Sequence, residues 1–497
     1  MKISIQDLMN QSGVQFGTSG ARGLAVEMTD RVCYAYTLGF LQHLRNIGDL
    51  PRLGTEVAVA GDFRPSTDRV LAAVCRAISD AGYTPLNGGK IPSPAVALCG
   101  LVKGIPALMV TGSHIPDDRN GIKFNKVAGE ILKANETGIR AQVVELTESH
   151  FDVAGGFAQP APPCPVQPRV GAAYVRRYLD WLPADALAGC RVGVYQHSAV
   201  GRDVLVEILR GLGAEVTPLG RSEKFIPVDT EAIRSEDVEL AARWAAEGRF
   251  DALVSADGDS DRPLISDEHG VWLRGDVAGI LCARFLGADS VSTPVSCNTA
   301  VEQCGWFATV RRTRIGSPFV VASMIEAAAS GAKCVVGYEA NGGFLLNSDL
   351  RREGRTLRAL PTRDAVIVLL GVLLLARREG QPVSALAASL PARFTASDRL
   401  KNFPVTQSQA ILRRFTTGSD TSGRAALEAI FGTVCGQVTA IDRTDGVRVT
   451  FASGEIVHLR PSGNAPEFRC YTEAATQSRA NKINALSMGI LRELAAA

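Results

Sequence analysis

Short apolar runs and helical stretches alternate along the first three quarters of the chain, in an order that repeats. Three segments each predict a helix that ends at a glycine and is followed by a strand: 71–86, 204–219 and 322–337. A glycine just after a helix provides the left-handed backbone with which the chain turns back towards a sheet. The pattern therefore predicts three related units that combine helices and strands.

Several apolar runs show little alternation between apolar and polar positions. They are Glu56 to Ala60, Arg191 to Tyr195 and Phe250 to Val254. A strand with one face in water alternates, so these runs predict strands covered by helices on both faces. The longest apolar run, Ala365 to Ala376, is too short to cross a bilayer and predicts a buried helix.

The last part of the chain has a different pattern. Short strands are predicted at 447–451, 455–459 and 468–472, and a helix from Gln477 to Leu494 follows them. This grouping is typical of a smaller α+β domain.

Two stretches predict boundaries between domains. Residues 155–168 contain five prolines and are typical of a linker, and residues 389–402 lead into the C-terminal pattern. We therefore predict four domains, namely α/β domain I at 1–158, α/β domain II at 159–268, α/β domain III at 269–392 and α+β domain IV at 393–497.

The strongest chemical signal is the segment Asp257-Gly258-Asp259-Ser260-Asp261-Arg262, directly after a predicted strand. Alternate residues of an extended chain point the same way, so the three carboxylates converge. Three anions held together repel one another unless a hard cation lies between them, and carboxylate oxygens suit Mg²⁺ or Ca²⁺. Arg262 adds a fixed positive charge, which a phosphate would need.

An EF-hand calcium loop and a solvated acidic loop are the alternatives for this segment. Counting from Asp257, an EF-hand needs glycine at the sixth position, where this chain has Arg262. An EF-hand also needs an entering helix, whereas the preceding residues 250–254 favour a strand. The sequence therefore favours a divalent-cation site at the end of a strand.

A second candidate locus is Thr111-Gly112-Ser113-His114, after the predicted strand Ala107 to Val110. A serine at the carboxyl end of a buried strand lies where open α/β sheets bind ligands, although a serine in an ordinary turn has the same sequence. Lys123 follows ten residues later, and it is a candidate proton shuttle if burial among cations lowers its pKa.

Two further loops have compositions that suit ligand binding or simple turns. The loop Arg460-Pro461-Ser462-Gly463-Asn464, with Arg469 beyond it, is either a nest for an anion or a hairpin turn. The glycine-rich segment from Gly337 to Gly343 carries Glu339 and Asn341, which suit sugar hydroxyls or any tight loop. No Walker loop or dinucleotide fingerprint is present in the sequence.

Composition excludes several functional classes. The chain has 497 residues, a hydrophobic content of 46% and a net charge of +2, which gives no support for nucleic-acid or membrane partners. Its eleven cysteines contain no Cys-x-x-Cys pair, which argues against a disulfide framework and a cysteine zinc site. The N-terminus lacks an apolar secretory core, so we expect a cytoplasmic protein. We also expect a monomer or a small homo-oligomer.

The four loops, in their order along the chain, resemble the α-D-phosphohexomutase superfamily. The similarity runs from the segment Phe16 to Gly23 through to Arg469. It implies an α/β fold in which three similar α/β domains with mixed sheets, plus a smaller C-terminal α+β domain, surround a central cleft. This organisation agrees with the repeats described above.

The resemblance also implies a role for each motif. Ser113 would be the phosphoserine that transfers the phosphoryl group, and Ser113, Asp257, Asp259 and Asp261 would bind Mg²⁺. The other catalytic residues would be His114, the acid/base candidate Lys123, and the charge-balancing residues Arg22 and Arg262. The substrate would be bound by Thr18, Ser19, Glu339, Asn341, Arg460, Ser462, Gly463, Asn464 and Arg469.

The implied activity is that of a phosphohexomutase, most like the bacterial phosphomannomutases that supply GDP-mannose synthesis. Mannose 1-phosphate and mannose 6-phosphate would interconvert through a sugar bisphosphate, which would also be the activator. Phosphoglucomutase is the near alternative. A metal-dependent sugar phosphatase and a non-catalytic protein that binds sugar phosphate or Ca²⁺ are alternatives from other classes.

Three departures from the family pattern affect the loops that would recognise the substrate. The sugar loop commonly reads Glu-x-Ser-Gly-His, whereas this chain ends the loop with Asn341-Gly342-Gly343. Asn464-Ala465 replace a Thr-Glu pair in the phosphate loop, and Ser317 replaces a histidine found in some members. The metal and serine loops are unaffected, so the sequence supports the reaction type more strongly than the sugar.

Overall fold

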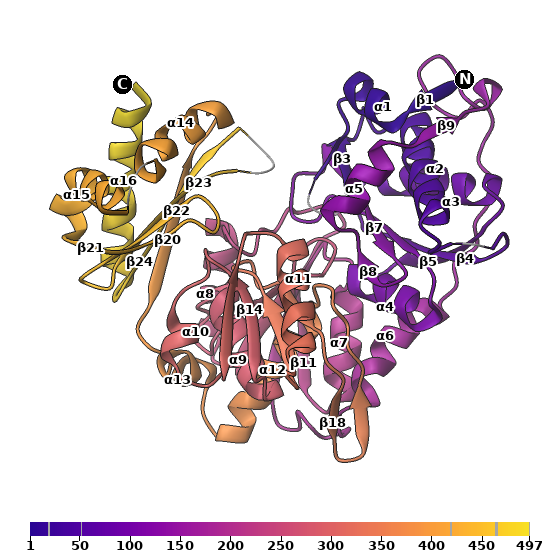
Figure 1. Cartoon of the computed structure of the whole chain (residues 1–497). Helices are drawn as coiled ribbons and strands as arrows, with labels where there is room; N and C mark the ends of the chain where they lie inside the picture. Colours follow the sequence, from indigo (N-terminus) through magenta and orange to yellow (C-terminus); the bar gives the residue numbers. More distant parts are fainter. Residues whose placement is uncertain (18–19, 51, 418–419, 463–465, 497) are drawn as a thin grey trace.

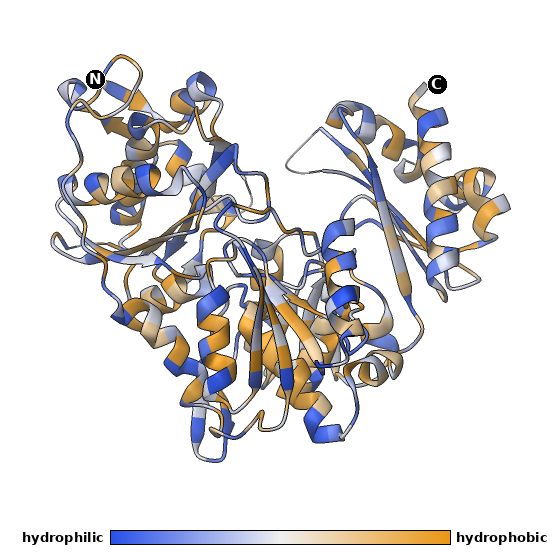
Figure 2. Ribbon diagram, turned by 180° about the vertical axis from the view of Figure 1, so that it is seen from behind, coloured by the Kyte–Doolittle hydropathy of each residue, from blue (hydrophilic) through white to orange (hydrophobic). Residues whose placement is uncertain are grey.

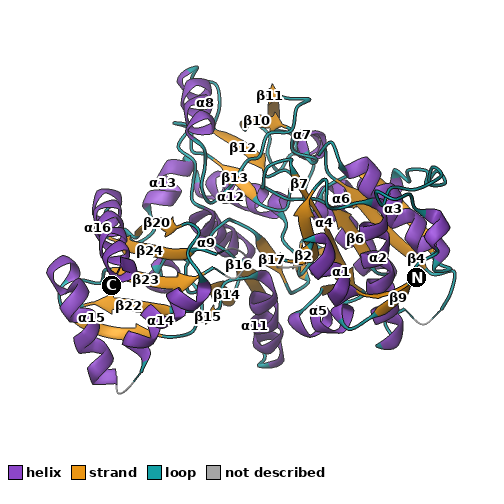
Figure 3. Ribbon diagram, turned by 90° about the horizontal axis from the view of Figure 1, so that it is seen from above, coloured by secondary structure: helices purple, strands orange, loops and turns teal. Residues whose placement is uncertain are grey.

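The computed structural model describes residues 1–17, 20–50, 52–417, 420–462 and 466–496. Four main sheets follow one another along the chain, and Figure 1 shows them arranged in a V. The N-terminal sheet forms one arm and the C-terminal sheet the other, while the second and third sheets lie at the junction. The view from above shows the same order from one end of the molecule to the other (Figure 3).

The N-terminal sheet is mixed and has the strand order β2-β3-β7-β6-β4-β5, with β8 paired to β7. Its strands are β2 (Gln15–Phe16), β3 (Gly20–Leu24), β4 (Glu56–Gly61), β5 (Thr84–Lys90), β6 (Ala107–Val110), β7 (Arg119–Lys126) and β8 (Gly129–Glu130). The helices of this part are α1 (Ile5–Ser12), α2 (Asp30–Asn46), α3 (Thr67–Asp80), α4 (Ser93–Lys103) and α5 (Lys133–Arg140). A two-stranded sheet of β1 (Lys2–Ser4) and β9 (Val143–Glu145) and the 3₁₀ turn η1 (Glu148–His150) complete it.

The second and third sheets have equivalent topologies, β11-β10-β12-β13 and β15-β14-β16-β17. The second contains β10 (Arg191–His197), β11 (Glu215–Arg221), β12 (Ala252–Ala256) and β13 (Pro263–Ile265), with helices α6 (Arg169–Leu179), α7 (Arg202–Gly211) and α8 (Ser235–Ala246). The third contains β14 (Ser290–Pro294), β15 (Thr309–Thr313), β16 (Val335–Tyr338) and β17 (Phe344–Leu346), with helices α9 (Gly275–Leu286), α10 (Ala300–Gln303), α11 (Ser317–Ala329), α12 (Ala365–Glu379) and α13 (Val383–Ala388). A hairpin of β18 (Leu350–Arg352) and β19 (Arg355–Leu357) projects from the third part.

The first three sheets share one pairing scheme. In each, a central strand (β4, β10 or β14) pairs in parallel with two neighbours, and a later strand (β7, β13 or β17) pairs antiparallel with one of those neighbours. The predicted relationship between three α/β units is therefore confirmed. The segment 322–337, however, is not equivalent to 71–86 and 204–219, because it ends in the third strand of its sheet and they end in the second.

The fourth sheet is antiparallel throughout, with the order β20-β24-β23-β22-β21. Its elements are β20 (Phe394–Leu400), β21 (Val438–Asp442), β22 (Val447–Phe451), β23 (Ile456–Pro461), β24 (Phe468–Ala474), α14 (Val405–Thr416), α15 (Asp420–Cys435) and α16 (Gln477–Ala496). A separate apolar core lies within this part, which confirms the predicted smaller α+β domain.

Helix α12 lies in the middle of the largest apolar core, as its sequence predicts. Its residues from Ala365 to Leu375 are all buried, and the core around it extends over the second and third sheets. Figure 2 shows hydrophobic residues concentrated on the strands and helices of this lower central part. Within the described ranges, no helix combines the length and the apolar character needed to cross a membrane.

Candidate phosphoryl-transfer site

Three of the predicted loops occupy the same place in the three related sheets. Ser113 follows β6, Asp257 follows β12 and Glu339 follows β16, and each of these strands is the third of its unit. Each loop leads into the antiparallel fourth strand. The repeated topology thus places three polar loops at the carboxyl ends of parallel strands, where α/β sheets bind ligands.

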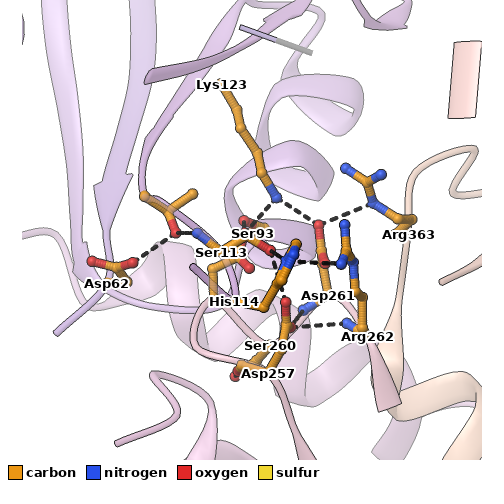
Figure 4. Close-up of polar contacts among 12 residues, drawn as sticks. Asp62, Ser93, Ser113, His114, Lys123, Asp257, Ser260, Asp261, Arg262 and Arg363 are labelled. Carbon is orange, nitrogen blue, oxygen red and sulfur yellow. Dashed lines mark hydrogen bonds and ion pairs between the residues drawn. The ribbon is translucent and has the colours of Figure 1, made fainter. Parts of the chain in front are cut away.

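Ser113 lies directly against the acidic loop. Its Oγ donates a hydrogen bond of 2.8 Å to Asp257 Oδ2, and the residue is only 1% exposed (Figure 4). The backbone of Ser113 is left-handed, with φ of 59°, and its N–H donates to Thr111 Oγ1 at 2.7 Å. Gly258 allows this approach, because a Cβ there would lie 2.6 Å from the Ser113 carbonyl oxygen. The two loops therefore meet as the sequence predicts.

The three aspartates form one buried cluster in which their ligand atoms all lie within 4.8 Å of one another. Asp259 Oδ1 and Asp261 Oδ1 are buried and accept no hydrogen bond from the described residues. Buried carboxylate oxygens that accept no hydrogen bond are costly, and a hard divalent cation is a suitable partner for them. The loop follows β12 and not a helix, so an EF-hand does not fit.

Lys123 neutralises part of this acidic cluster. Its Nζ lies 2.5 Å from Asp259 Oδ2 and 2.6 Å from Asp261 Oδ2. Burial lowers the pKa of Lys123, but the two carboxylates raise it by more, so the pKa lies above its usual value. The sequence makes Lys123 a proton shuttle only if burial among cations lowers its pKa. That condition is wrong, because the ammonium group contacts two carboxylates.

The pKa of Asp257 and that of Asp261 move in opposite directions from the usual value. Burial and the neighbouring carboxylates raise the pKa of Asp257, whose Oδ1 accepts the N–H groups of Asp261 and Arg262 at 3.1 Å each. Burial raises the pKa of Asp261 too, but Lys123 and the nearby arginines lower it more strongly. The anionic form is therefore favoured at Asp261 and disfavoured at Asp257 when no cation is bound.

His114 is held as a neutral imidazole. Arg262 Nη1 lies 2.8 Å from His114 Nδ1, which must accept this hydrogen bond because a guanidinium can only donate. Burial and the charge of Arg262 lower the pKa of His114 to about 3. Arg22, on β3, lies near the same charges, and its burial together with Arg262 lowers its pKa to about 10.

Several contributors to the site carry no motif in the sequence. Ser93 Oγ donates to Asp259 Oδ2 at 2.5 Å, and Arg363 Nε donates to Asp261 Oδ2 at 3.1 Å. Arg64 donates to the Ser113 carbonyl oxygen at 2.7 Å. The sequence could mark two of them only by their place at the start of a helix, since Ser93 begins α4 and Arg363 comes just before α12.

The predicted sugar and phosphate loops lie in the third and fourth parts. The carbonyl oxygen of Asn341 accepts a hydrogen bond from Thr230 Oγ1 at 2.6 Å. Arg460 forms an ion pair of 3.3 Å with Asp445, and Arg469 one of 3.0 Å with Glu467. Ser462 N–H donates to the Glu467 carbonyl oxygen at 2.8 Å. The predicted residues outside the described ranges are Thr18, Ser19, Gly463 and Asn464.

The two arginines of the phosphate loop do not join the serine loop directly. Among the described residues, no hydrogen bond or ion pair connects Arg460 or Arg469 with Ser113 or the aspartates. A contact between the third and fourth parts comes instead from Asp445, whose Oδ2 accepts the N–H of Ile315 at 2.9 Å.

Four protein-family models match consecutive parts of this chain. They describe the alpha/beta/alpha domains I, II and III of phosphoglucomutase/phosphomannomutase at residues 13–150, 172–270 and 274–394, and the C-terminal domain at 400–486. Phosphomannomutases from Sinorhizobium fredii and Salmonella muenchen are each 42% identical to the chain over 96% of its length. These matches cover 99% and 95% of the two relatives.

A solved structure shows the same fold. A phosphoglucomutase/phosphomannomutase family protein from Burkholderia thailandensis matches with a TM-score of 0.72 and 18% identity, over 99% of this chain and 98% of that one. The four-part α/β fold with its serine and aspartate loops defines a member of the α-D-phosphohexomutase superfamily. Within it, the chain belongs to the phosphoglucomutase/phosphomannomutase family.

Proposed function

We propose that this protein is a Mg²⁺-dependent phosphomannomutase that interconverts mannose 1-phosphate and mannose 6-phosphate. The observation that carries the proposal is the hydrogen bond of 2.8 Å between Ser113 Oγ and Asp257 Oδ2, within a cluster of three buried aspartates. A nucleophilic hydroxyl beside a cation site is the arrangement that phosphoryl transfer requires. The preference for mannose rests on the two relatives that are 42% identical.

In the proposed cycle, Ser113 carries a phosphoryl group and returns to a free hydroxyl once in each turnover. The 6-hydroxyl of mannose 1-phosphate attacks the phosphorus of phosphoserine, the P–O bond to Ser113 Oγ breaks, and the proton of the 6-hydroxyl passes to the departing Ser113 Oγ. The product is a sugar 1,6-bisphosphate. After this intermediate reorients in the site, Ser113 Oγ attacks the phosphorus of the 1-phosphate. The bond from that phosphorus to the sugar O1 breaks, the serine proton passes to O1, and mannose 6-phosphate leaves. A trace of bisphosphate would phosphorylate a resting Ser113 and so act as the activator.

The acidic cluster fits the proposed cation. Asp257, Asp259 and Asp261, with an oxygen of phosphorylated Ser113, would hold Mg²⁺, which when bound would neutralise charge on the transferring group. The residues of the chain supply further positive charge nearby, because Lys123 contacts two of the aspartates and Arg262 contacts His114. Arg22 would add a third cation.

The remaining substrate contacts are proposals from the family pattern. Glu339 and Asn341 would bind sugar hydroxyls, and Thr18 and Ser19 would line the reacting end. The non-reacting phosphate would be bound by Arg460, Ser462, Gly463, Asn464 and Arg469. We further infer the domain limits 158, 268 and 392, a cytoplasmic monomer or small homo-oligomer, and a product used for GDP-mannose synthesis.

Turnover with three substrates tests the proposal. With Mg²⁺ and a trace of sugar bisphosphate, mannose 1-phosphate should be isomerised faster than glucose 1-phosphate or glucosamine 1-phosphate. Ser113→Ala should abolish isomerisation while binding of the sugar phosphate survives. Retained isomerisation in this variant would refute the assignment of Ser113 as the phosphoserine. Release of inorganic phosphate by the wild type at a rate that rivals isomerisation would indicate a phosphatase.

A further inference from the structure

Arg363 is a buried arginine that contacts three separate parts of the molecule. It is 4% exposed and lies at the end of the loop that leads into α12. Its Nε donates to Asp261 Oδ2 at 3.1 Å, and its Nη1 donates to Glu339 Oε2 at 3.3 Å. Its Nη2 lies 3.9 Å from Glu130 Oε1. One guanidinium therefore joins the aspartate loop, the predicted sugar loop and strand β8 of the N-terminal sheet.

The contact with Asp261 determines which of its oxygens is available to a cation. Asp261 Oδ2 accepts hydrogen bonds from both Arg363 and Lys123, whereas Oδ1 accepts none from the described residues. Figure 4 shows Asp261 between these two cationic side chains. Because the two donors hold one carboxylate oxygen, they fix the rotation of the group and the direction of the other oxygen.

The contact with Glu339 connects the same guanidinium to the sugar loop. Glu339 is buried, and the hydrogen bond from Arg363 Nη1 holds its carboxylate in position. Glu130 and its neighbours support Arg363 from the other side, since Ser317 Oγ and Thr362 Oγ1 each donate to Glu130 at 2.9 Å. Arg363 is thus held in place by its own set of contacts.

Two of the sequence departures provide the space that Arg363 occupies. A Cβ at Gly343 would lie 2.5 Å from Arg363 Cδ, so a larger residue at this position would displace the arginine. Ser317, fully buried, lies with its Oγ 3.5 Å from Arg363 Nη1. The family pattern has histidine at the position of Gly343, and some members have histidine at that of Ser317. The small residues of this chain make room for the guanidinium at both positions.

We propose that Arg363 is a positioning residue that couples the cation site to the sugar site. Its one planar guanidinium holds both Asp261 and Glu339, so it fixes the orientation of the cation ligand and of the sugar ligand at the same time. This proposal rests on the function proposed above, because it assigns a cation to the aspartates and a sugar to Glu339. It predicts that a change at Arg363 alters both sites at once.

Direct binding of Mn²⁺ to the whole protein, measured by titration calorimetry or electron paramagnetic resonance without substrate, tests the cation half of the coupling. Arg363→Gln should weaken Mn²⁺ binding by about tenfold or more, the usual cost of removing a residue that orients a metal ligand. The KM for the sugar phosphate should rise in the same variant. Arg363→Lys should rescue neither property, because lysine has one nitrogen where arginine uses Nε for Asp261 and Nη1 for Glu339.

Gly343→Ala provides a second test that retains every charge. The added methyl group displaces Arg363, so Mn²⁺ binding should weaken although residue 343 lies outside the aspartate loop. This variant also decides the matter if Arg363→Gln does not fold. The matched control is Arg358→Gln, since Arg358 is exposed and its nearest carboxylate is 3.9 Å away; both properties should stay at wild-type values.

The outcomes separate this proposal from the proposed function. Wild-type affinity for Mn²⁺ in both Arg363→Gln and Gly343→Ala would overturn the coupling, even in an active mutase. A rise in KM without a change in Mn²⁺ affinity would overturn it as well. If the wild-type protein isomerises no hexose phosphate but the variants lose Mn²⁺ affinity, the proposed function fails while the positioning of Asp261 by Arg363 stands.

Discussion

The guanidinium of Arg64 holds the backbone carbonyl of Ser113 at 2.7 Å. The same group donates to the carbonyl oxygens of Pro116, Ile115 and Arg119 and to Asp62 Oδ2, so all five of its N–H groups have partners. Asp62 in turn accepts from Thr111, whose hydroxyl oxygen binds the Ser113 N–H. Arg64 therefore fixes the left-handed turn that directs Ser113 towards the aspartates.

Arg64→Lys should destabilise the protein and slow turnover. An ammonium group has three donors and no planar fork, so several carbonyl groups and the buried Asp62 would lose their partners. Breaking a buried ion pair of this kind costs about 3 kcal/mol or more. Denaturant unfolding and kcat should both report the change. Arg69→Lys is the control, because Arg69 is largely exposed where it pairs with Asp30, and similar losses in both variants would contradict the assignment.

Gly258→Ala should separate the serine and aspartate loops with little effect on the rest of the fold. The new Cβ would lie 2.6 Å from the Ser113 carbonyl oxygen, which is backbone and cannot move freely. A displacement of about 1 Å at a reacting group can cost about 100-fold in rate, so kcat should fall to that extent. Steady-state kinetics and circular dichroism measure the two effects. Gly287→Ala, where the Cβ meets open space but φ is 74°, should instead lower stability without a comparable loss of kcat.

The sequence predicts the loops of the site well because their residues follow strands of one repeated unit. Ser113, Asp257 and Glu339 each lie at the end of an apolar run, and such runs are recognisable without any contact information. The sequence predicts the strand before Asp257 at 250–254, whereas the strand is Ala252–Ala256. All five of its residues are buried, so the strand continues up to the acidic loop.

The supporting residues were not predictable in the same way. Arg64 binds mostly backbone carbonyl groups, which every residue has, so its partners leave no pattern in the sequence. Arg363 reaches Asp261 across 102 positions and Glu130 from a different sheet. The condition that the pKa of Lys123 falls among cations is also wrong, because only the folded chain shows that its ammonium group contacts two carboxylates, which outweigh burial and Arg363.

Asp364 connects helix α6 of the second part with helix α12 of the third part, and Asp364→Asn should lower the stability of the fold. Tyr174 and Tyr178 of α6 both donate hydrogen bonds to its carboxylate, and Asp364 also caps α12 by accepting the Val366 N–H at 3.1 Å. An amide nitrogen cannot accept, so one buried tyrosine hydroxyl would lose the acceptor for its proton, at a cost of about 1–3 kcal/mol. Denaturant unfolding measures this loss. The exposed Asp180→Asn should change stability far less, and equal effects would refute the role of Asp364.

His458 should make the fold less stable in mild acid. Its Nε2 donates to the Asp445 carbonyl oxygen at 2.6 Å, while its buried Nδ1 has no hydrogen-bond partner among the described residues. Burial lowers its pKa from 6.5 to about 4; the Asp445 carbonyl and carboxylate raise the pKa, and Arg460 and Arg448 lower it further. The folded state therefore prefers the neutral ring.

The sign of the pH effect follows from this lowered pKa. Above pH 6.5 the ring is neutral in both the folded and the unfolded chain, so its contribution to stability is fully present. As the pH falls from 6.5 towards 4, the unfolded chain binds a proton that the folded chain refuses, and stability falls by about 1.4 kcal/mol per pH unit. Unfolding measured between pH 6.5 and 5 should show a shallower dependence in His458→Gln than in the wild type. The exposed His269→Gln should keep the wild-type slope, and an unchanged slope in His458→Gln would show that His458 does not titrate on unfolding.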